Sequence, residues 1–141
     1  MHGELSSRSN LGIRYHNYPH CGVNFSHTGF VREEYAKAIN SSRMLASCGG
    51  RYHLAMNKIF ESMGCCTAYV GEKPYGEQEF HLKDGVNYIA VDSGNFIEKI
   101  QYNLGHEQEL LSIVKNAKET FEQFHHLDAR ARDFVELLKT I

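Results

Sequence analysis

The sequence has no long apolar run. No stretch of its 141 residues approaches the length needed to cross a bilayer, and the amino terminus lacks the apolar segment of a signal peptide. We therefore expect a cytoplasmic protein without a transmembrane segment. The formal net charge is only −2 at pH 7, which gives no electrostatic reason to expect nucleic acid as a partner. The length fits one ordinary domain, large enough for a hydrophobic core.

Cysteine is also scarce. The four cysteines are Cys21, Cys48, Cys65 and Cys66, in a chain that is longer and less loop-rich than a typical disulfide scaffold. We therefore expect reduced thiols, with the adjacent cysteines at the start of a buried strand.

Metal-binding motifs are absent as well, because the sequence contains neither CxxC nor HExxH. The nearest approach is the segment HNYPHC, which holds His16, His20 and Cys21 and is followed by His27. We predict no bound metal at these residues and no cofactor. A histidine- and cysteine-based metal protein is kept as an alternative hypothesis.

Short apolar segments alternate with amphipathic segments along the chain. Residues 1–22 show no sustained period and are expected to be irregular. Apolar runs predict four short strands, at residues 23–25, 43–47, 66–70 and 88–91. Apolar residues spaced by three and four predict helices at residues 31–40, 54–63, 95–104, 106–124 and 128–141. Because the strands are short and almost wholly apolar, we predict an α/β fold with a parallel sheet, flanking helices and a helical carboxyl-terminal tail.

Two expectations concern the ends of this arrangement. In the last helix, Asp128 is placed to cap the start, and an apolar stripe follows the helical period. Its members are Ala131, Phe134, Val135 and Leu138. At the other end, no strand is predicted before residue 23, which leaves a sheet edge open. We expect dimerisation, or covering of that edge by the amino-terminal segment.

A polar edge stands out in the helix of residues 54–63. Asn57, Lys58 and Glu61 lie together on one face, three and four positions apart. The opposite face is apolar and consists of Met56, Ile59, Phe60 and Met63. This combination predicts a helix that packs on the sheet and presents charge at its rim.

A glycine-rich turn, CGGRYH, precedes this helix at the end of the predicted strand 43–47. In open parallel sheets, ligands bind where strands end and helices begin. Gly49 and Gly50 let the backbone approach a ligand, and amides at a helix amino terminus attract phosphate. Lys58 adds a cation, and Glu61 can accept hydrogen bonds from a ribose diol. Neither GxGxxG nor GxxxxGK[ST] occurs, and Lys58 and Glu61 also fit a solvated ion pair, so both interpretations stay open.

Two segments of the chain keep a familiar order of features. The first is REEYAKAINSSRMLASCGGRYHLAMNKIFESMGCCTAYVGEKP, and the later one is LKDGVNYIAVDSGNFIEKIQYNLGHEQELLSIVKNAKETFEQFHHLDARARDFVELL. Over residues 23–141 the chain resembles the carboxyl-terminal, donor-binding half of a GT-B glycosyltransferase. The closest resemblance is to the group-1-like family that includes spore-coat and capsule-associated enzymes. The matching positions are Tyr35, Ser42, Lys58, Phe60, Glu61, Gly64, Asp84, Gly85, Asn87, Glu98, Lys99, Ile100, Tyr102, His126 and Arg130.

The resemblance implies a Rossmann-like half-domain that binds a UDP-, GDP- or dTDP-sugar without a metal or other cofactor. In such enzymes a glutamate at the position of Glu61 holds the ribose, while loop amides and a basic residue such as Lys58 hold the diphosphate. His53 stands where many retaining members carry a second glutamate, eight positions earlier. The expected donor site is Gly49, Gly50, Arg51, His53, Asn57, Lys58 and Glu61.

Two functional hypotheses from different classes follow. The first is the donor domain of a nucleotide-sugar glycosyltransferase. This chain alone is then expected to be inactive, because the acceptor domain is expected to be separate or supplied by another chain. The second is a non-catalytic binding or assembly module that kept the fold. His53 in place of glutamate favours the second, and the retained Lys58 and Glu61 favour the first.

Overall fold

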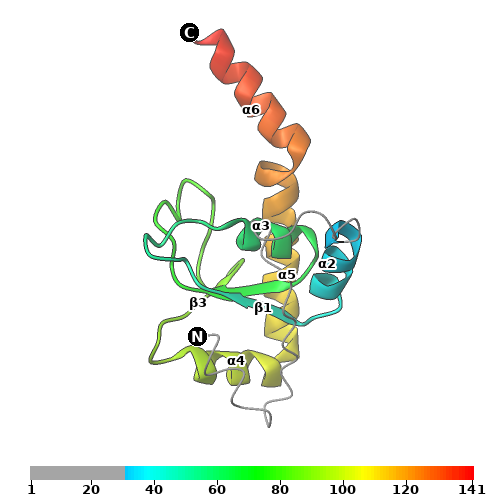
Figure 1. The fold of residues 1–141 in the computed structure, drawn as a ribbon, viewed down its shortest axis with the longest axis vertical. Coiled ribbons are helices and arrows are strands. Elements are labelled where there is room, and N and C mark those ends of the chain that lie inside the picture. The colour runs from blue at the N-terminus through cyan, green and yellow to red at the C-terminus, as the bar shows by residue number, and fades with distance from the viewer. Residues whose placement is uncertain (1–30) are drawn as a thin grey trace.

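The structure, a computed structural model, describes residues 31–141, so the predicted strand 23–25 and the histidine-rich segment lie outside the described residues. Three parallel strands form a sheet in the order β1-β2-β3, with helices on both sides (Figure 1). The elements are α2 (Val31–Asn40), β1 (Met44–Ser47), α3 (Asn57–Gly64), β2 (Ala68–Gly71), β3 (Ile89–Ala90), α4 (Phe96–Gly105), α5 (Glu107–Thr120), the π-helical turn η3 (Phe121–His125) and α6 (Leu127–Lys139). The predicted α/β class, parallel sheet and helical tail are confirmed.

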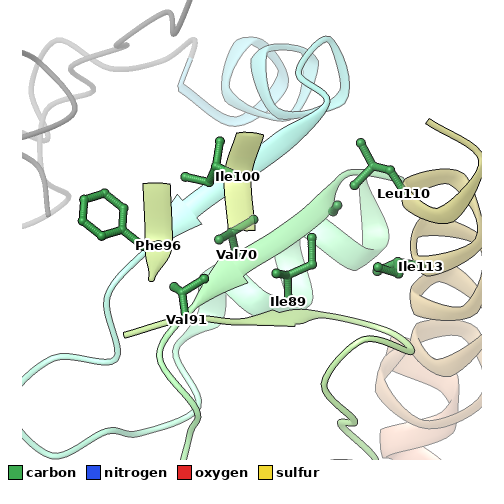
Figure 2. Packing of buried hydrophobic residues seen from close by; sticks show 8 residues of the cluster. Val70, Ile89, Val91, Phe96, Ile100, Leu110 and Ile113 are labelled. Carbon is green, nitrogen blue, oxygen red and sulfur yellow. The ribbon is translucent and has the colours of Figure 1, made fainter. Parts of the chain in front are cut away.

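The sheet is buried on both faces, because neighbouring residues of β2 point to opposite sides. One face packs against α4 and α5 (Figure 2), with a core of Ala68, Val70, Ile89, Val91, Phe96, Ile100, Leu110 and Ile113. The other face packs against α3 and the end of α5, with a core of Ile59, Met63, Tyr69, Leu82, Tyr88 and Ala117. The short, apolar strands are therefore those of a doubly covered sheet, as their composition predicted.

Two boundaries around α3 differ from the sequence prediction. The helix begins at Asn57 rather than at residue 54, and Met56 is its extended N-cap, which leaves that side chain outside the buried stripe. Strand β2 begins at Ala68 rather than at Cys66, because Cys66 has a φ of 56°, in the left-handed region that no strand uses. Cys66 is exposed, not buried in a strand, and Cys48, Cys65 and Cys66 are all free thiols.

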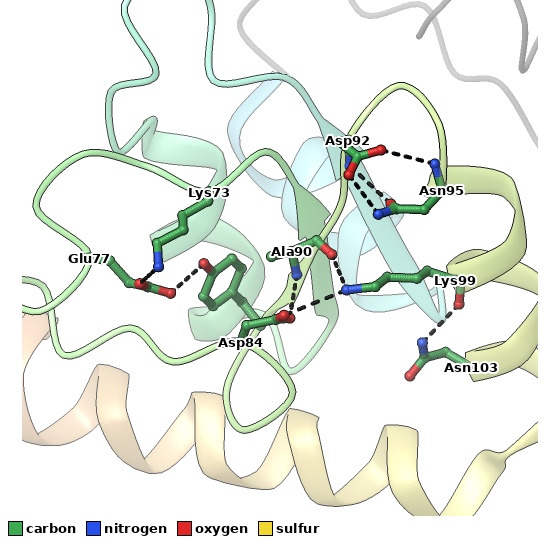
Figure 3. A network of polar contacts seen from close by, with 9 residues as sticks. Lys73, Glu77, Asp84, Ala90, Asp92, Asn95, Lys99 and Asn103 are labelled. Carbon is green, nitrogen blue, oxygen red and sulfur yellow. Dashed lines mark hydrogen bonds and ion pairs between the residues drawn. The ribbon is translucent and has the colours of Figure 1, made fainter.

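The edge of the sheet at β3 is closed by side chains (Figure 3). The Ala90 amide donates to Asp84 Oδ1 at 2.7 Å, and the Ala90 carbonyl accepts from Lys99 Nζ at 2.6 Å. Lys99 and Asp84 also pair with each other, at 3.5 Å. A charged clamp of this kind keeps an edge strand from pairing with another chain. At the opposite edge, all four residues of β1 are partly exposed, and the expected cover by upstream residues stays a prediction.

The carboxyl-terminal helices also differ from expectation. His126, not Asp128, is the N-cap of α6, since its ring accepts a hydrogen bond from the Asp128 amide at 3.4 Å. The predicted apolar stripe of α6 is present but is not buried, and Ala129 is the residue of α6 that is. Helix α6 extends away from the sheet (Figure 1). Among residues 31–141 no helix is long and apolar enough to cross a membrane.

Candidate functional site

The loop between β1 and α3 lies at the carboxyl edge of the sheet. Ser47 at the end of β1 is in register with Gly71 at the end of β2, so the residues that follow each strand meet at the same edge. The Gly49 amide donates to Glu72 Oε2 at 2.9 Å, which joins the loop after β1 to the residue that follows β2. A Cβ at Gly49 would lie 3.2 Å from the His53 backbone, which explains why glycine suits this position.

The loop folds back on itself through two residues with positive φ. Gly50 has a φ of 67° and His53 a φ of 48°, and the Leu54 amide donates to the Gly49 carbonyl at 3.1 Å. The His53 carbonyl accepts from the Tyr75 amide at 2.7 Å, and His53 Nδ1 lies 3.9 Å from Glu72 Oε2. The loop and the segment after β2 therefore form one hydrogen-bonded unit that holds the His53 ring at the rim.

A second cluster joins α2 to the polar face of α3. The Tyr35 hydroxyl donates to Glu61 Oε2 at 2.6 Å, and Lys58 Nζ lies 3.2 Å from the same oxygen. Lys58 Nζ also contacts the Tyr35 hydroxyl and lies 4.1 Å from the centre of that ring. The side chains of Lys58 and Glu61 are 40% and 37% exposed, so a ligand can reach both.

The expected site residues thus divide between two groups. Gly49, Gly50 and His53 belong to the loop held by Glu72, whereas Lys58 and Glu61 belong to the Tyr35 cluster. Arg51 stacks over the neighbouring Tyr52 ring at 5.8 Å, and Asn57 is exposed at the first position of α3. The Lys58–Glu61 ion pair that the sequence analysis kept as an alternative is therefore present, and Tyr35 contacts both of its members.

Sequence reasoning placed Tyr35 only on an apolar stripe and in a family pattern, and it missed Glu72. The Tyr35 contacts span 23 and 26 positions, so no local spacing signals them. Glu72 carries a weak signal, because it is the first residue after a buried strand at the ligand-binding edge. Its bond to Gly49 also changes one expectation. The sequence suggested a Gly49 amide free to bind phosphate, whereas this amide donates to the Glu72 carboxylate.

Beneath this edge the backbone is closely packed. A Cβ at Gly71 would lie 2.6 Å from the Ser47 carbonyl oxygen, so only glycine fits at the end of β2. The Tyr69 hydroxyl reaches the same carbonyl at 3.4 Å. Burial raises the pKa of Tyr69 to about 12, so the phenol stays neutral at physiological pH. The floor of the site is therefore rigid and uncharged.

A cavity of about 390 Å³ lies elsewhere, beside the clamped edge of β3. It contains none of the expected donor-site residues. Its lining is Asp84, Gly85, Ile89, Lys99, Tyr102, Asn103, Glu109, Ser112, Ile113 and Asn116. The charged groups are already engaged: Lys99 with Asp84 and Ala90, and the Tyr102 hydroxyl with Glu109 at 3.2 Å. We therefore place the candidate site at the carboxyl edge and not in this cavity.

No cluster of three potential metal-ligating side chains occurs within residues 31–141. His16, His20, Cys21 and His27 lie outside the described residues, so the expectation of no metal there stays a prediction.

A family model described as glycosyl transferase-like matches residues 2–136, nearly the whole chain. The chain belongs to this glycosyl transferase-like family. The match covers both the loop after β1 and helix α3, so the candidate site lies inside a glycosyltransferase domain. No curated protein and no solved structure matches the chain.

Proposed function

We propose that this glycosyltransferase domain is the donor-binding half of a GT-B enzyme and binds a nucleoside diphosphate sugar at the carboxyl edge of its sheet. The observation that carries the proposal is the Tyr35–Lys58–Glu61 cluster, in which the partly exposed Lys58 and Glu61 lie on the helix that follows the glycine loop. A carboxylate held by a hydroxyl and an ammonium group is fixed in orientation. That is the state in which Glu61 accepts hydrogen bonds from a ribose diol.

The proposed diphosphate position lies between Lys58 and the Gly49–Arg51 turn. Lys58 and Arg51 supply two cations, and the amino terminus of α3 follows the loop along the chain. When the sugar is transferred, the bond from its anomeric carbon to the phosphate oxygen breaks, and negative charge grows on the departing diphosphate. Cations and fixed amides at that position stabilise this charge. His53 and Asn57 complete the proposed donor pocket.

The test is calorimetric titration with UDP, GDP and dTDP, first with wild type and then with Glu61→Ala. A hydrogen bond to a charged group is worth ~1.5–3 kcal/mol, so losing one or two predicts about tenfold weaker binding or more. The matched control is Glu119→Ala, which removes an exposed glutamate that also pairs with a lysine on its own helix, at 3.9 Å. The control is expected to bind like wild type.

Lys58→Ala refines the assignment. It is expected to weaken nucleoside diphosphates and to spare a nucleoside without phosphates, because only the diphosphate carries the charge that lysine contacts. If Lys58 and Glu61 form only a solvated pair, both variants cost a few tenths of a kcal/mol in stability and change no affinity. Wild-type affinity in Glu61→Ala would reject the donor site on α3.

The second candidate is a non-catalytic binding module, favoured by His53 in place of a glutamate and by Glu72 on the Gly49 amide. The two candidates differ in turnover rather than in binding. Release of nucleoside diphosphate from a bound donor sugar, whether to water or to an acceptor, supports the enzyme. Tight binding without any release, in the presence of a partner that completes the cleft, supports the module.

A further inference from the structure

Helix α6 presents an apolar surface that residues 31–141 do not cover. Leu127 is 77% exposed, Phe134 60% and Leu138 54%, and Ala131 between them is exposed too. We call these four residues the α6 seam. Large apolar side chains gathered on one surface mark an interaction site far more often than scattered ones do.

The spacing of the α6 seam is that of a coiled coil. Its members follow one another by four, three and four positions, and Ile141, 95% exposed, continues the series by three. An apolar residue every 3.5 positions on average is the pattern that packs one helix against another. Ala129, which lies on another face of α6, is buried. The first turn of α6 thus anchors the helix to the body, while the seam faces away from it.

We propose that the α6 seam binds the same seam of a second copy of this chain, with the two helices antiparallel. In that arrangement Leu127 of one copy lies opposite Leu138 of the other, and Ala131 opposite Phe134, because each pair of positions has the same midpoint. A small residue then faces a large one in the central layers, which fills the space evenly. A parallel pair would instead set Phe134 against Phe134 and Ala131 against Ala131.

The charges on one flank of the seam favour the same arrangement. Asp128 and Lys139 are eleven positions apart, about three helical turns, so they lie on the same flank. In an antiparallel pair the same flank of each helix faces the other chain, and the two flanks run in opposite directions. Asp128 of each chain then lies near Lys139 of the other, which gives two such contacts in the dimer. Both side chains are well exposed, at 79% and 63%. Pairs of this kind contribute orientation and register more than affinity.

The overall shape is compatible with this pairing. Helix α6 runs away from the sheet and ends free of it (Figure 1), so an antiparallel pair keeps the two bodies at opposite ends. A seam of about three turns is short for a permanent dimer. We therefore expect a reversible dimer whose population rises with concentration. A helix of this length is marginal in water on its own, so pairing also stabilises the helical state of α6.

Sedimentation equilibrium over a range of concentrations tests the proposal. Wild type is expected to show a monomer–dimer equilibrium, and Phe134→Asp is expected to abolish it, because the substitution buries a charge in each central layer. Leu111→Asp is the matched control: it puts the same charge on an exposed apolar residue of α5, 53% exposed and outside the seam, and is expected to dimerise like wild type. Phe134→Leu keeps the seam apolar and is expected to dimerise too.

A charge exchange tests the orientation. Asp128→Lys alone is expected to weaken the dimer, because it sets two lysines together on each flank, and Lys139→Asp added to it is expected to restore the dimer. In a parallel pair these positions are three turns apart, so the second substitution restores nothing. A wild-type monomer at every concentration, or a dimer that survives Phe134→Asp, overturns the proposal. Neither outcome bears on donor binding, which uses other residues.

Discussion

Glu72 is expected to oppose the donor that the site is proposed to bind. Its carboxylate accepts the Gly49 amide at 2.9 Å, at the position where the diphosphate is proposed to lie, and its side chain is 32% exposed. Two negative groups then compete for one amide. The isosteric substitution Glu72→Gln keeps a hydrogen-bond acceptor for Gly49 and removes the charge.

The size of the effect follows from Coulomb's law. Two unit charges 4 Å apart interact by about 1 kcal/mol in water and about 4 kcal/mol at an effective dielectric constant of 20. Because Glu72 is partly exposed, the lower end applies, at about 1–2 kcal/mol for a diphosphate. Glu72→Gln is thus expected to tighten nucleoside diphosphate binding by roughly 5- to 30-fold.

The assay is calorimetric titration of wild type and Glu72→Gln with a nucleoside diphosphate and with the matching nucleoside. The gain is expected for the diphosphate alone and is expected to shrink as salt is added, because partly exposed charges are screened. An equal gain for the nucleoside would point to a change in loop shape instead. Unchanged or weaker diphosphate binding would refute the reasoning and place the phosphates away from Gly49.

Three further predictions concern stability. Burial lowers the pKa of His125, whose Nε2 lies 2.9 Å from the Phe80 carbonyl oxygen, so the folded state binds fewer protons than the unfolded state. Its contribution to stability is therefore complete above about pH 6.5 and is lost as the pH falls below that value, and thermal unfolding of His125→Gln is expected to show a flatter acid limb than wild type. Asp84→Ala removes the acceptor of the Ala90 amide in an exposed contact that water can replace, and is expected to cost about 0.5–1.5 kcal/mol in urea unfolding, with a smaller loss for Asp84→Asn. Met63→Ala empties a fully buried position and is expected to cost about 2–5 kcal/mol.

The sequence predicted the framework well because the framework depends on local patterns. The predicted helix 31–40 coincides with α2, and predicted strands 43–47 and 88–91 contain β1 and β3. Each is a short apolar or amphipathic run bounded by turn residues, so the period of its apolar residues identifies the element. The predicted start of β2 was wrong by two residues, because Cys66 adopts a left-handed backbone conformation that an apolar pattern cannot indicate.

The contacts that sequence reasoning missed join residues that are distant along the chain. Periodicity showed that α6 is amphipathic but could not show whether its stripe meets the body, since that depends on the direction of the chain after His126. The same limit applies to the site. Lys58 and Glu61 were found because they share one helix, whereas Tyr35 and Glu72 reach the site from other elements.

The two interpretations of Lys58 and Glu61, an internal ion pair and a donor contact, are not exclusive. In the free protein Glu61 pairs with Lys58 and accepts a hydrogen bond from Tyr35, and the Gly49 amide donates to Glu72. In the proposed complex a phosphate replaces Glu72 at the Gly49 amide, so the net gain there is a difference between two hydrogen bonds. The internal partners of Glu61 both contact Oε2, so a ribose diol can add its hydrogen bonds at the second oxygen. The chain's net charge of −2 supplies no attraction at long range. Donor affinity then depends on how well the phosphate replaces Glu72 at the Gly49 amide and on the hydrogen bonds that the ribose adds at Glu61.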